Sequence, residues 1–227
     1  MPVRVVFFDL GETLFDETRP WGAWADWLGV PRLTFFGVLG GVIERGEHHR
    51  RVFEIVRPGV DLARERAARV AAGGGAWFDR ADLYPDAVPC LHALRAEGYQ
   101  VRLAGNHTTE EEFSVGGLGL PLDVVTSAAA CGFEKPAPGF FAHLVEVAGV
   151  RAEEIAYVGD RLDNDVLPAR AAGMVAVFLR RGPWGYLHAD RPEAARAHLR
   201  LDSLTELPAA LRDFDRPSRR IEQERPS

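Results

Sequence analysis

The chain has 227 residues, of which 47% are hydrophobic and 26% are charged, an ordinary composition for a globular protein. Its net charge of -6 argues against nucleic acid as the main partner, because phosphate backbones select basic surfaces. The longest apolar runs fall far short of the roughly 20 residues that a membrane helix needs, and no signal peptide precedes the first predicted strand. We therefore expect a cytoplasmic protein without a membrane partner, and the sequence does not indicate its oligomeric state.

Short apolar runs that end at polar residues predict strands buried on both faces of a parallel sheet. They are Val3–Phe8, Val101–Ala104, a weaker run at Leu122–Val125, Ile155–Val158 and Val175–Leu179. Three helical patterns lie between them, each followed by a glycine stop: Pro85–Glu97, Pro138–Ala148 and Asn164–Ala172. This alternation predicts an α/β fold with a doubly wound parallel sheet.

Residues 17–83 interrupt this order and contain several helical stretches but no clear strand. We expect helices at Trp21–Leu28, Leu33–Arg45, His48–Val56 and Leu62–Ala72, and a joint or helix end at glycines 73–75. The predicted organisation is a core domain of residues 1–16 and 84–212, a helical insert of residues 17–83, and a disordered polar tail of residues 213–227.

Three tryptophans of the insert and both cysteines are interpreted as packing residues. Trp21, Trp24 and Trp27 recur every three residues and predict a packing stripe on the insert. Cys90 and Cys131 are too few for a disulfide framework and lack metal-ligand spacing, so we expect both to be buried small hydrophobes.

The residues that follow the predicted strands point to chemistry at one edge of the sheet. Asp9 follows the first strand, Gly105–Thr108 the second, Lys135 lies in the loop after the third, and Asp160 follows the fourth, with Asp165 five residues later. Ligands of open α/β sheets bind outside the carboxyl ends of the strands. We therefore expect a lysine and several carboxylates to converge there.

Carboxylates packed this closely repel one another unless a cation neutralises them. A hard divalent ion with oxygen ligands satisfies this need, and Mg²⁺ suits a site that handles phosphate. An ionised aspartate beside such an ion can attack phosphorus and form an aspartyl-phosphate, while a lysine neutralises charge on the transferring group. The sequence predicts this chemistry for Asp9 and Lys135.

The motifs resemble those of the haloacid dehalogenase-like (HAD) superfamily. Its first motif, an apolar strand and then Asp-x-Asp-x-Thr, corresponds to Asp9–Thr13, and its lysine motif, commonly Lys-Pro-x-Pro, to Lys135–Pro138. Its Gly-Asp-x4-Asp motif corresponds to Gly159–Asp165. The segment Leu83–Asp86 resembles members with a helical (C1-type) cap. The resemblance covers roughly residues 3 to 210.

The resemblance implies a role for each matching residue. Asp9 would be the nucleophile and a Mg²⁺ ligand, with the backbone carbonyl of Gly11 and the carboxylate of Asp160 as further ligands. Asp165 would join the metal site by positioning its waters or the lysine. Lys135 would bridge Asp9 and the phosphate of a small phosphorylated substrate, and the insert would be a cap that excludes water and selects that substrate.

Two positions depart from the family pattern. The second aspartate of the first motif, which serves as general acid and base, is Gly11 here. Glu12 and Asp16 are nearby candidates to replace it, and we prefer Asp16 as the catalytic substitute. At the second motif, the usual Ser or Thr is Gly105, so that its backbone, the Asn106 amide or the Thr108 hydroxyl would bind the phosphate.

Three functions from different classes compete. A capped, magnesium-dependent phosphatase of a small phosphomonoester leads, because Asp9, Lys135, Asp160 and Asp165 are all retained. A degenerate relative that binds a phosphorylated metabolite or a protein partner without turnover would explain the two glycines. A carbon–halogen hydrolase is disfavoured by the retained acid pair of the fourth motif.

Overall fold

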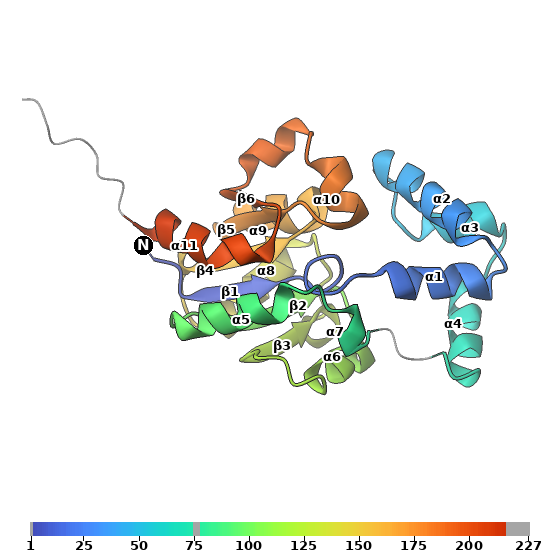
Figure 1. Ribbon diagram of the computed structural model, residues 1–227, viewed down its shortest axis with the longest axis horizontal. Coiled ribbons are helices and arrows are strands. Elements are labelled where there is room, and N and C mark those ends of the chain that lie inside the picture. The colour runs from blue at the N-terminus through green and yellow to red at the C-terminus, as the bar shows by residue number, and fades with distance from the viewer. Residues whose placement is uncertain (1, 75–77, 217–227) are drawn as a thin grey trace, which may run out of the picture.

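The computed structural model describes residues 2–74 and 78–216, and within them one sheet contains six parallel strands in the order β3-β2-β1-β4-β5-β6 (Figure 1). The strands are β1 (Val5–Phe8), β2 (Gln100–Gly105), β3 (Val124–Ser127), β4 (Ile155–Gly159), β5 (Val175–Leu179) and β6 (Leu199–Leu201). Every residue of β1, β4 and β5 is buried, as the continuous apolar runs predict. The predicted doubly wound parallel sheet is confirmed.

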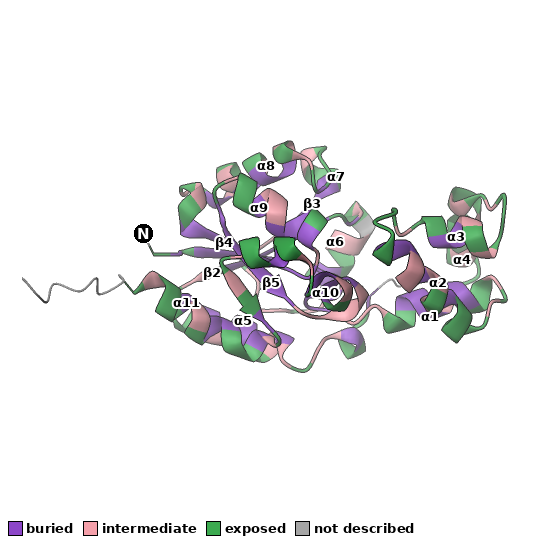
Figure 2. Ribbon diagram, turned by 90° about the horizontal axis from the view of Figure 1, so that it is seen from above, coloured by how far each residue is buried: buried purple, intermediate pink, exposed green. Residues whose placement is uncertain are grey.

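Helices cover both faces of the sheet, which lies as a buried layer between them (Figure 2). One face packs against α5 (Ala87–Ala96) and α11 (Leu207–Asp215), and the other against α8 (Pro138–Ala148) and α9 (Leu167–Ala171). A π-helical turn at Leu162–Val166 leads into α9. The helices α6 (Thr109–Gly116), α7 (Ala128–Cys131) and α10 (Gly182–His188) also flank the sheet.

The helical insert follows β1 and lies to one side of the sheet (Figure 1). It consists of α1 (Thr18–Trp27), α2 (Arg32–Glu44), α3 (Arg51–Val56) and α4 (Leu62–Ala71). Its own apolar cluster includes Trp21, Trp24, Phe35 and Phe53, so two members of the predicted tryptophan stripe pack as expected. Trp27, by contrast, is 38% exposed.

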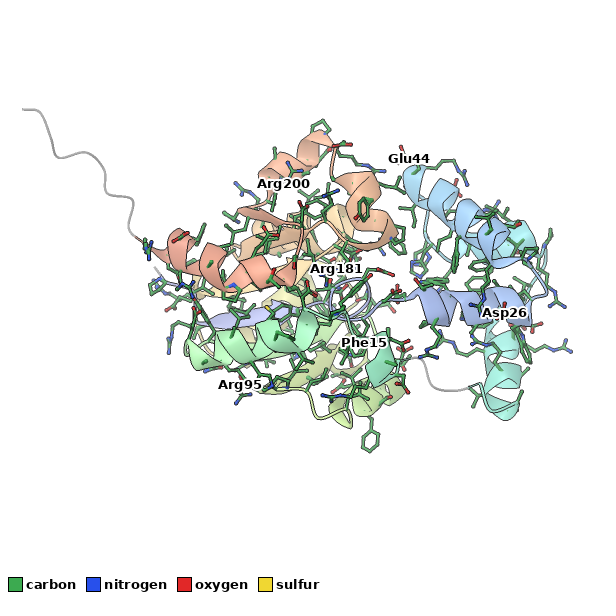
Figure 3. All side chains as sticks on the ribbon, in the orientation of Figure 1. Phe15, Asp26, Glu44, Arg95, Arg181 and Arg200 are labelled. Atoms are coloured by element: carbon green, nitrogen blue, oxygen red, sulfur yellow. The ribbon has the colours of Figure 1, made fainter. Side chains whose placement is uncertain are left out.

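Side chains from the core domain join the insert to the sheet. Trp184 of α10 belongs to the apolar cluster of the insert. Glu44, labelled at the end of α2 in Figure 3, accepts a hydrogen bond from Arg191 through its backbone carbonyl at 3.3 Å. The insert is therefore held against the edge of the sheet at which the strands end.

Some details differ from the sequence predictions. Cys90 is buried as expected, but Cys131 is only partly buried at the end of α7. Residues 213–215 belong to α11, so this part of the predicted disordered tail is helical, because Leu211 anchors the helix in the core. Residues 217–227 of that tail and Gly75 of the predicted joint lie outside the described residues. Among the described residues, no helix combines the length and the apolar character needed to cross a membrane.

Candidate active site

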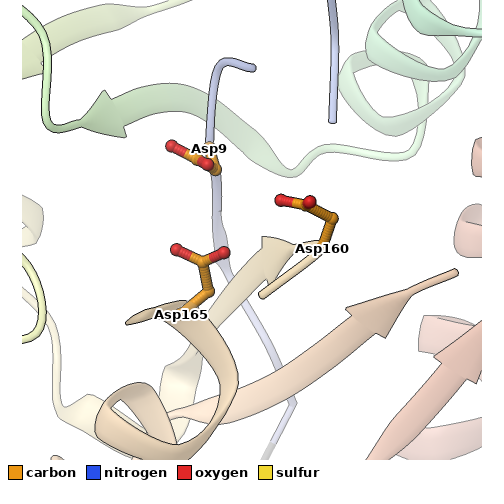
Figure 4. Close-up of side chains that lie close together, drawn as sticks. All are labelled: Asp9, Asp160 and Asp165. Atoms are coloured by element: carbon orange, nitrogen blue, oxygen red, sulfur yellow. The ribbon is translucent and has the colours of Figure 1, made fainter. Parts of the chain in front are cut away.

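The acidic residues predicted from the strand ends meet where the order of the sheet reverses. β1 lies between β2 and β4, and Asp9 and Asp160 follow the carboxyl ends of β1 and β4. Oxygen atoms of Asp9, Asp160 and Asp165 lie within 4.8 Å of one another, and Figure 4 shows the three carboxylates facing a common space. A doubly wound sheet places its ligand site at this switch point.

A lysine from a neighbouring loop binds this acidic cluster. The Nζ atom of Lys135 donates hydrogen bonds of 2.7 Å to Asp9 Oδ1 and of 2.7 Å to Asp165 Oδ1. The loop that carries the lysine is fixed by Asn106, whose amide donates to the Lys135 carbonyl at 2.9 Å and accepts from the Lys135 backbone N–H at 2.7 Å. The Asn106 amide therefore positions the lysine through both of its polar atoms.

Burial and neighbouring charges both shift the pKa values of this cluster. Burial lowers the pKa of Lys135, but the carboxylates of Asp165 and Asp9 outweigh that effect and hold it well above its ordinary value. Burial raises the pKa of Asp165 to about 6 despite the lysine. Burial, Asp165 and Asp9 all raise the pKa of Asp160. Lys135 therefore remains charged, while the carboxylates lack enough positive charge to compensate them.

The donor set fits a hard divalent cation. Asp160 is 2% exposed, and its Oδ2 atom has no hydrogen-bond partner among the residues that the structure describes. Asp165 differs, because its Oδ1 accepts from Lys135 and its Oδ2 accepts from the Arg161 backbone N–H at 3.0 Å. Asp9, Asp160 and Gly11 line the adjoining cavity, and carboxylate and carbonyl oxygens are the ligands that such ions prefer. Asp165 instead binds the ammonium group of Lys135 and so helps to position it beside Asp9.

The site opens into a cavity of about 520 Å³ between the sheet edge and the insert. The core contributes polar groups, including Lys135, His107 and Thr108. The insert contributes an aromatic and basic wall: Trp21, Trp24, His49, Arg50, Phe53 and Arg66. A cavity of this size, with aromatic rings on the side of the insert and polar groups on the side of the core, suits a small polar molecule.

The candidates to replace the missing second aspartate lie in different surroundings. Asp16 Oδ1 accepts from the Thr18 backbone N–H at 2.7 Å, and Asp16 is absent from the described residues that line the cavity. Glu12 is buried, and its Oε2 accepts from the Tyr84 hydroxyl at 2.5 Å. Glu17, which the sequence analysis did not single out, lines the cavity, and burial raises its pKa to about 8.

The predicted phosphate-binding loop after β2 places His107 and Thr108, but not Gly105, among the described residues that line the cavity. Gly105 ends β2, and Thr108 lines the cavity while its Oγ1 caps α6 by accepting from Glu111 at 3.2 Å. His107 lies between them, lines the cavity and is 6% exposed. Burial lowers its pKa to about 4, so its ring is neutral at neutral pH.

Comparisons with known proteins agree with this architecture. Residues 3–173 match the family model of the haloacid dehalogenase-like hydrolases. The chain is 31% identical to the phosphoserine phosphatase of Thermus thermophilus over 206 residues, which cover 86% of this chain and 80% of that protein. It is 35% identical to a glyceraldehyde 3-phosphate phosphatase of Methanopyrus kandleri over 149 residues, 63% of this chain and 64% of that protein, just under two thirds of its length.

Solved structures share the fold at low sequence identity. The HAD hydrolase YfnB of Bacillus subtilis, whose structure is described as bound to magnesium, has a TM-score of 0.68 at 18% identity, with 93% of this chain and 99% of that chain covered. A HAD phosphatase of Thermococcus onnurineus has a TM-score of 0.58 at 24% identity, with 92% and 98% covered. The family match over residues 3–173 shows that the chain belongs to the haloacid dehalogenase-like hydrolases.

Proposed function

We propose that the protein is a magnesium-dependent phosphatase that cleaves a small phosphomonoester through an aspartyl-phosphate on Asp9. The observation that carries this proposal is the ammonium group of Lys135, which lies 2.7 Å from both Asp9 and Asp165, together with the buried Oδ2 of Asp160, which has no hydrogen-bond partner among the described residues. Relatives named as phosphatases, including those of phosphoserine and glyceraldehyde 3-phosphate, support the reaction class.

The residues divide the work of phosphoryl transfer. One carboxylate oxygen of Asp9 attacks phosphorus, and the bond from phosphorus to the leaving oxygen breaks. Lys135 orients Asp9 and neutralises charge on the transferring oxygens, with Asp165 holding the lysine in place. Asp9, Asp160 and the Gly11 carbonyl would hold Mg²⁺, which supplies further charge neutralisation when it is bound.

The helical insert, residues 17–83, would act as the cap over the core domain of residues 1–16 and 84–212. It contributes Trp21, Trp24 and Phe53 to the cavity, along with basic residues. These rings would exclude water during phosphoryl transfer, and their spacing from the acidic cluster would limit the substrate to a small molecule. Gly105 and Thr108 would line the phosphate subsite opposite the cap.

The test is a panel of phosphomonoesters that includes phosphoserine and glyceraldehyde 3-phosphate, assayed with Mg²⁺ and with a chelator. We expect magnesium-dependent phosphate release that Asp9→Asn abolishes, because the amide is not a nucleophile. The matched control Asp213→Asn removes an exposed carboxylate of α11 and should behave like the wild type. Equal release by Asp9→Asn, or no release from any substrate, would overturn the proposal.

A further inference from the structure

The space beside Gly11 is already filled by another acidic side chain. A Cβ atom placed on Gly11 would lie 2.6 Å from the carboxyl carbon of Glu17 and 2.6 Å from its Oε1 atom. Real Cβ atoms do not approach other atoms so closely. The Glu17 carboxyl group therefore occupies the position of a side chain at residue 11, where relatives with the full first motif carry their second aspartate.

The contacts of Glu17 fix its carboxyl group over this position. Its backbone N–H donates to Glu12 Oε1 at 3.1 Å, and its Oε2 accepts from the indole N–H of Trp21 at 3.2 Å. These contacts orient Oε1 toward Gly11 and leave the carboxyl group on the wall of the cavity. Glu12, in contrast, directs both of its oxygens to protein partners, Glu17 and Tyr84.

We propose that Glu17 is the general acid and base of the reaction and replaces the aspartate that Gly11 lacks; this rests on the proposed phosphatase function. As Asp9 attacks phosphorus and the bond to the leaving oxygen breaks, the Glu17 carboxyl group gives its proton to that oxygen and releases the alcohol. A water molecule then attacks the aspartyl-phosphate. Glu17 takes one proton from this water, and the bond between phosphorus and Asp9 breaks. Inorganic phosphate leaves, and the Asp9 carboxylate and the protonated Glu17 carboxyl group are restored.

Leaving groups of different acidity separate this role from a structural one. The variant Glu17→Gln keeps the shape of the side chain but cannot transfer a proton. With Mg²⁺ present, its kcat/KM for phenyl phosphate should fall by about 10²–10⁴-fold, the usual range for general acid–base catalysis. Its kcat/KM for p-nitrophenyl phosphate should fall far less, because nitrophenolate leaves without a proton. Asp16→Asn tests the alternative general acid–base residue and should not show this dependence on the leaving group.

The second half of the reaction gives an independent readout. With p-nitrophenyl phosphate, Glu17→Gln should release a burst of one equivalent of nitrophenolate and then turn over slowly, because the aspartyl-phosphate forms but its hydrolysis lacks a base. This burst also shows that the variant is folded. Uniform loss on both substrates without a burst, or the same signature in Asp16→Asn instead, would overturn the assignment to Glu17.

A double substitution tests whether the two positions share one space. Gly11→Asp alone should reduce activity, because its new Cβ atom displaces the Glu17 carboxyl group from the position beside residue 11. Gly11→Asp combined with Glu17→Ala vacates that space and should be more active on phenyl phosphate than Glu17→Ala alone. Additive losses would contradict the shared position. If Asp9→Asn keeps activity, the proposed function fails, whereas an inactive Asp9→Asn with a normal Glu17→Gln refutes only the role of Glu17.

A different observation supports a second inference, at Gly105. A Cβ on Gly105 would lie 2.7 Å from Asp9 Oδ1 and 3.1 Å from His107 Nδ1, so the imidazole lies where a side chain of residue 105 would point. Neither ring nitrogen of His107 has a hydrogen-bond partner within the described parts of the chain, although the side chain is buried. Buried polar atoms of this kind normally have partners.

We infer that His107 donates a ring N–H to an oxygen of the substrate phosphate and takes over the task of the missing Ser or Thr at residue 105. The probe is inorganic phosphate, titrated calorimetrically into the Mg²⁺-loaded protein. His107→Leu should weaken phosphate binding by about tenfold or more, the usual effect of a lost hydrogen bond to a charged group. His107→Asn keeps an N–H donor and should bind nearly as well as the wild type, and so should His92→Leu on the exposed side of α5. Unchanged binding by His107→Leu, or an equal loss in His107→Asn, would overturn the inference.

Discussion

Lys135→Met removes the positive charge from the centre of the acidic cluster while keeping much of the side-chain volume. In the wild type, the ammonium group forms two ion pairs of 2.7 Å, and the side chains of Lys135 and Asp165 are 1% and 0% exposed. Breaking a buried pair by removing one partner costs about 3–5 kcal/mol, because the remaining carboxylates stay buried without compensation. We expect a loss of this size in the free energy of unfolding of the metal-free protein.

Urea unfolding in the presence of a chelator measures this loss. The control Arg95→Met breaks a surface pair of similar length, the 2.8 Å contact with Asp123, whose partners are 43% and 32% exposed (Arg95 is labelled in Figure 3). It should cost at most about 1 kcal/mol. Asp165 takes up a proton near pH 6 in the wild type and at higher pH without the lysine, so the difference in stability between wild type and Lys135→Met should narrow as the pH falls toward about 6. Equal losses of unfolding free energy in the two variants would refute the electrostatic account of the cluster. A difference between wild type and Lys135→Met that does not change with pH would refute it as well.

Three further predictions concern stability. Burial raises the pKa of Glu17 to about 8, above its value of roughly 4.3 in an unfolded chain. The wild-type, metal-free protein should therefore lose stability as the pH rises from about 4 to about 8. Urea titrations should show that the stability of Glu17→Gln relative to wild type grows across this pH range. A flat difference would contradict this. Mg²⁺ at a hundredfold excess over its Kd should stabilise the wild type by about 2.7 kcal/mol, and Asp160→Asn should lose most of that gain in thermal unfolding; an undiminished gain would exclude Asp160 as a ligand. Phe35→Ala should destabilise the insert by about 3–5 kcal/mol, seen in tryptophan fluorescence because Trp21 and Trp24 share its cluster; an unchanged fluorescence transition would refute this.

Much of the fold could be predicted from the sequence because its central strands are buried on both faces. The apolar runs at β1, β4 and β5 are short, rich in β-branched and aromatic residues and flanked by turn residues, which favours strands over buried helices. β6 escaped prediction because Leu199–Leu201 is short and has Arg200 at its centre, so no apolar run marks it. Its pairing with β5 depends on tertiary contacts at the sheet edge.

The candidate site could be predicted where function depends on strand ends, and not where it depends on how loops fold back. Asp9, Lys135, Asp160 and Asp165 follow regular elements, so their convergence follows from the topology. Glu17 lies six residues beyond Gly11, and only the turn between them, with its Gly11–Phe15 bridge, returns it to that residue. No local pattern distinguishes it from Asp16.

The central claim is that Asp9 carries the phosphoryl group, and the most direct measurement is to find that group on the protein. Glu17→Gln would be mixed with p-nitrophenyl phosphate and Mg²⁺, quenched in acid during turnover, digested and mapped by mass spectrometry. The account predicts one phosphorylated peptide, which contains Asp9, and its absence in Asp9→Asn/Glu17→Gln. Phosphate on another residue, or rapid turnover with no phosphorylated peptide, would contradict it.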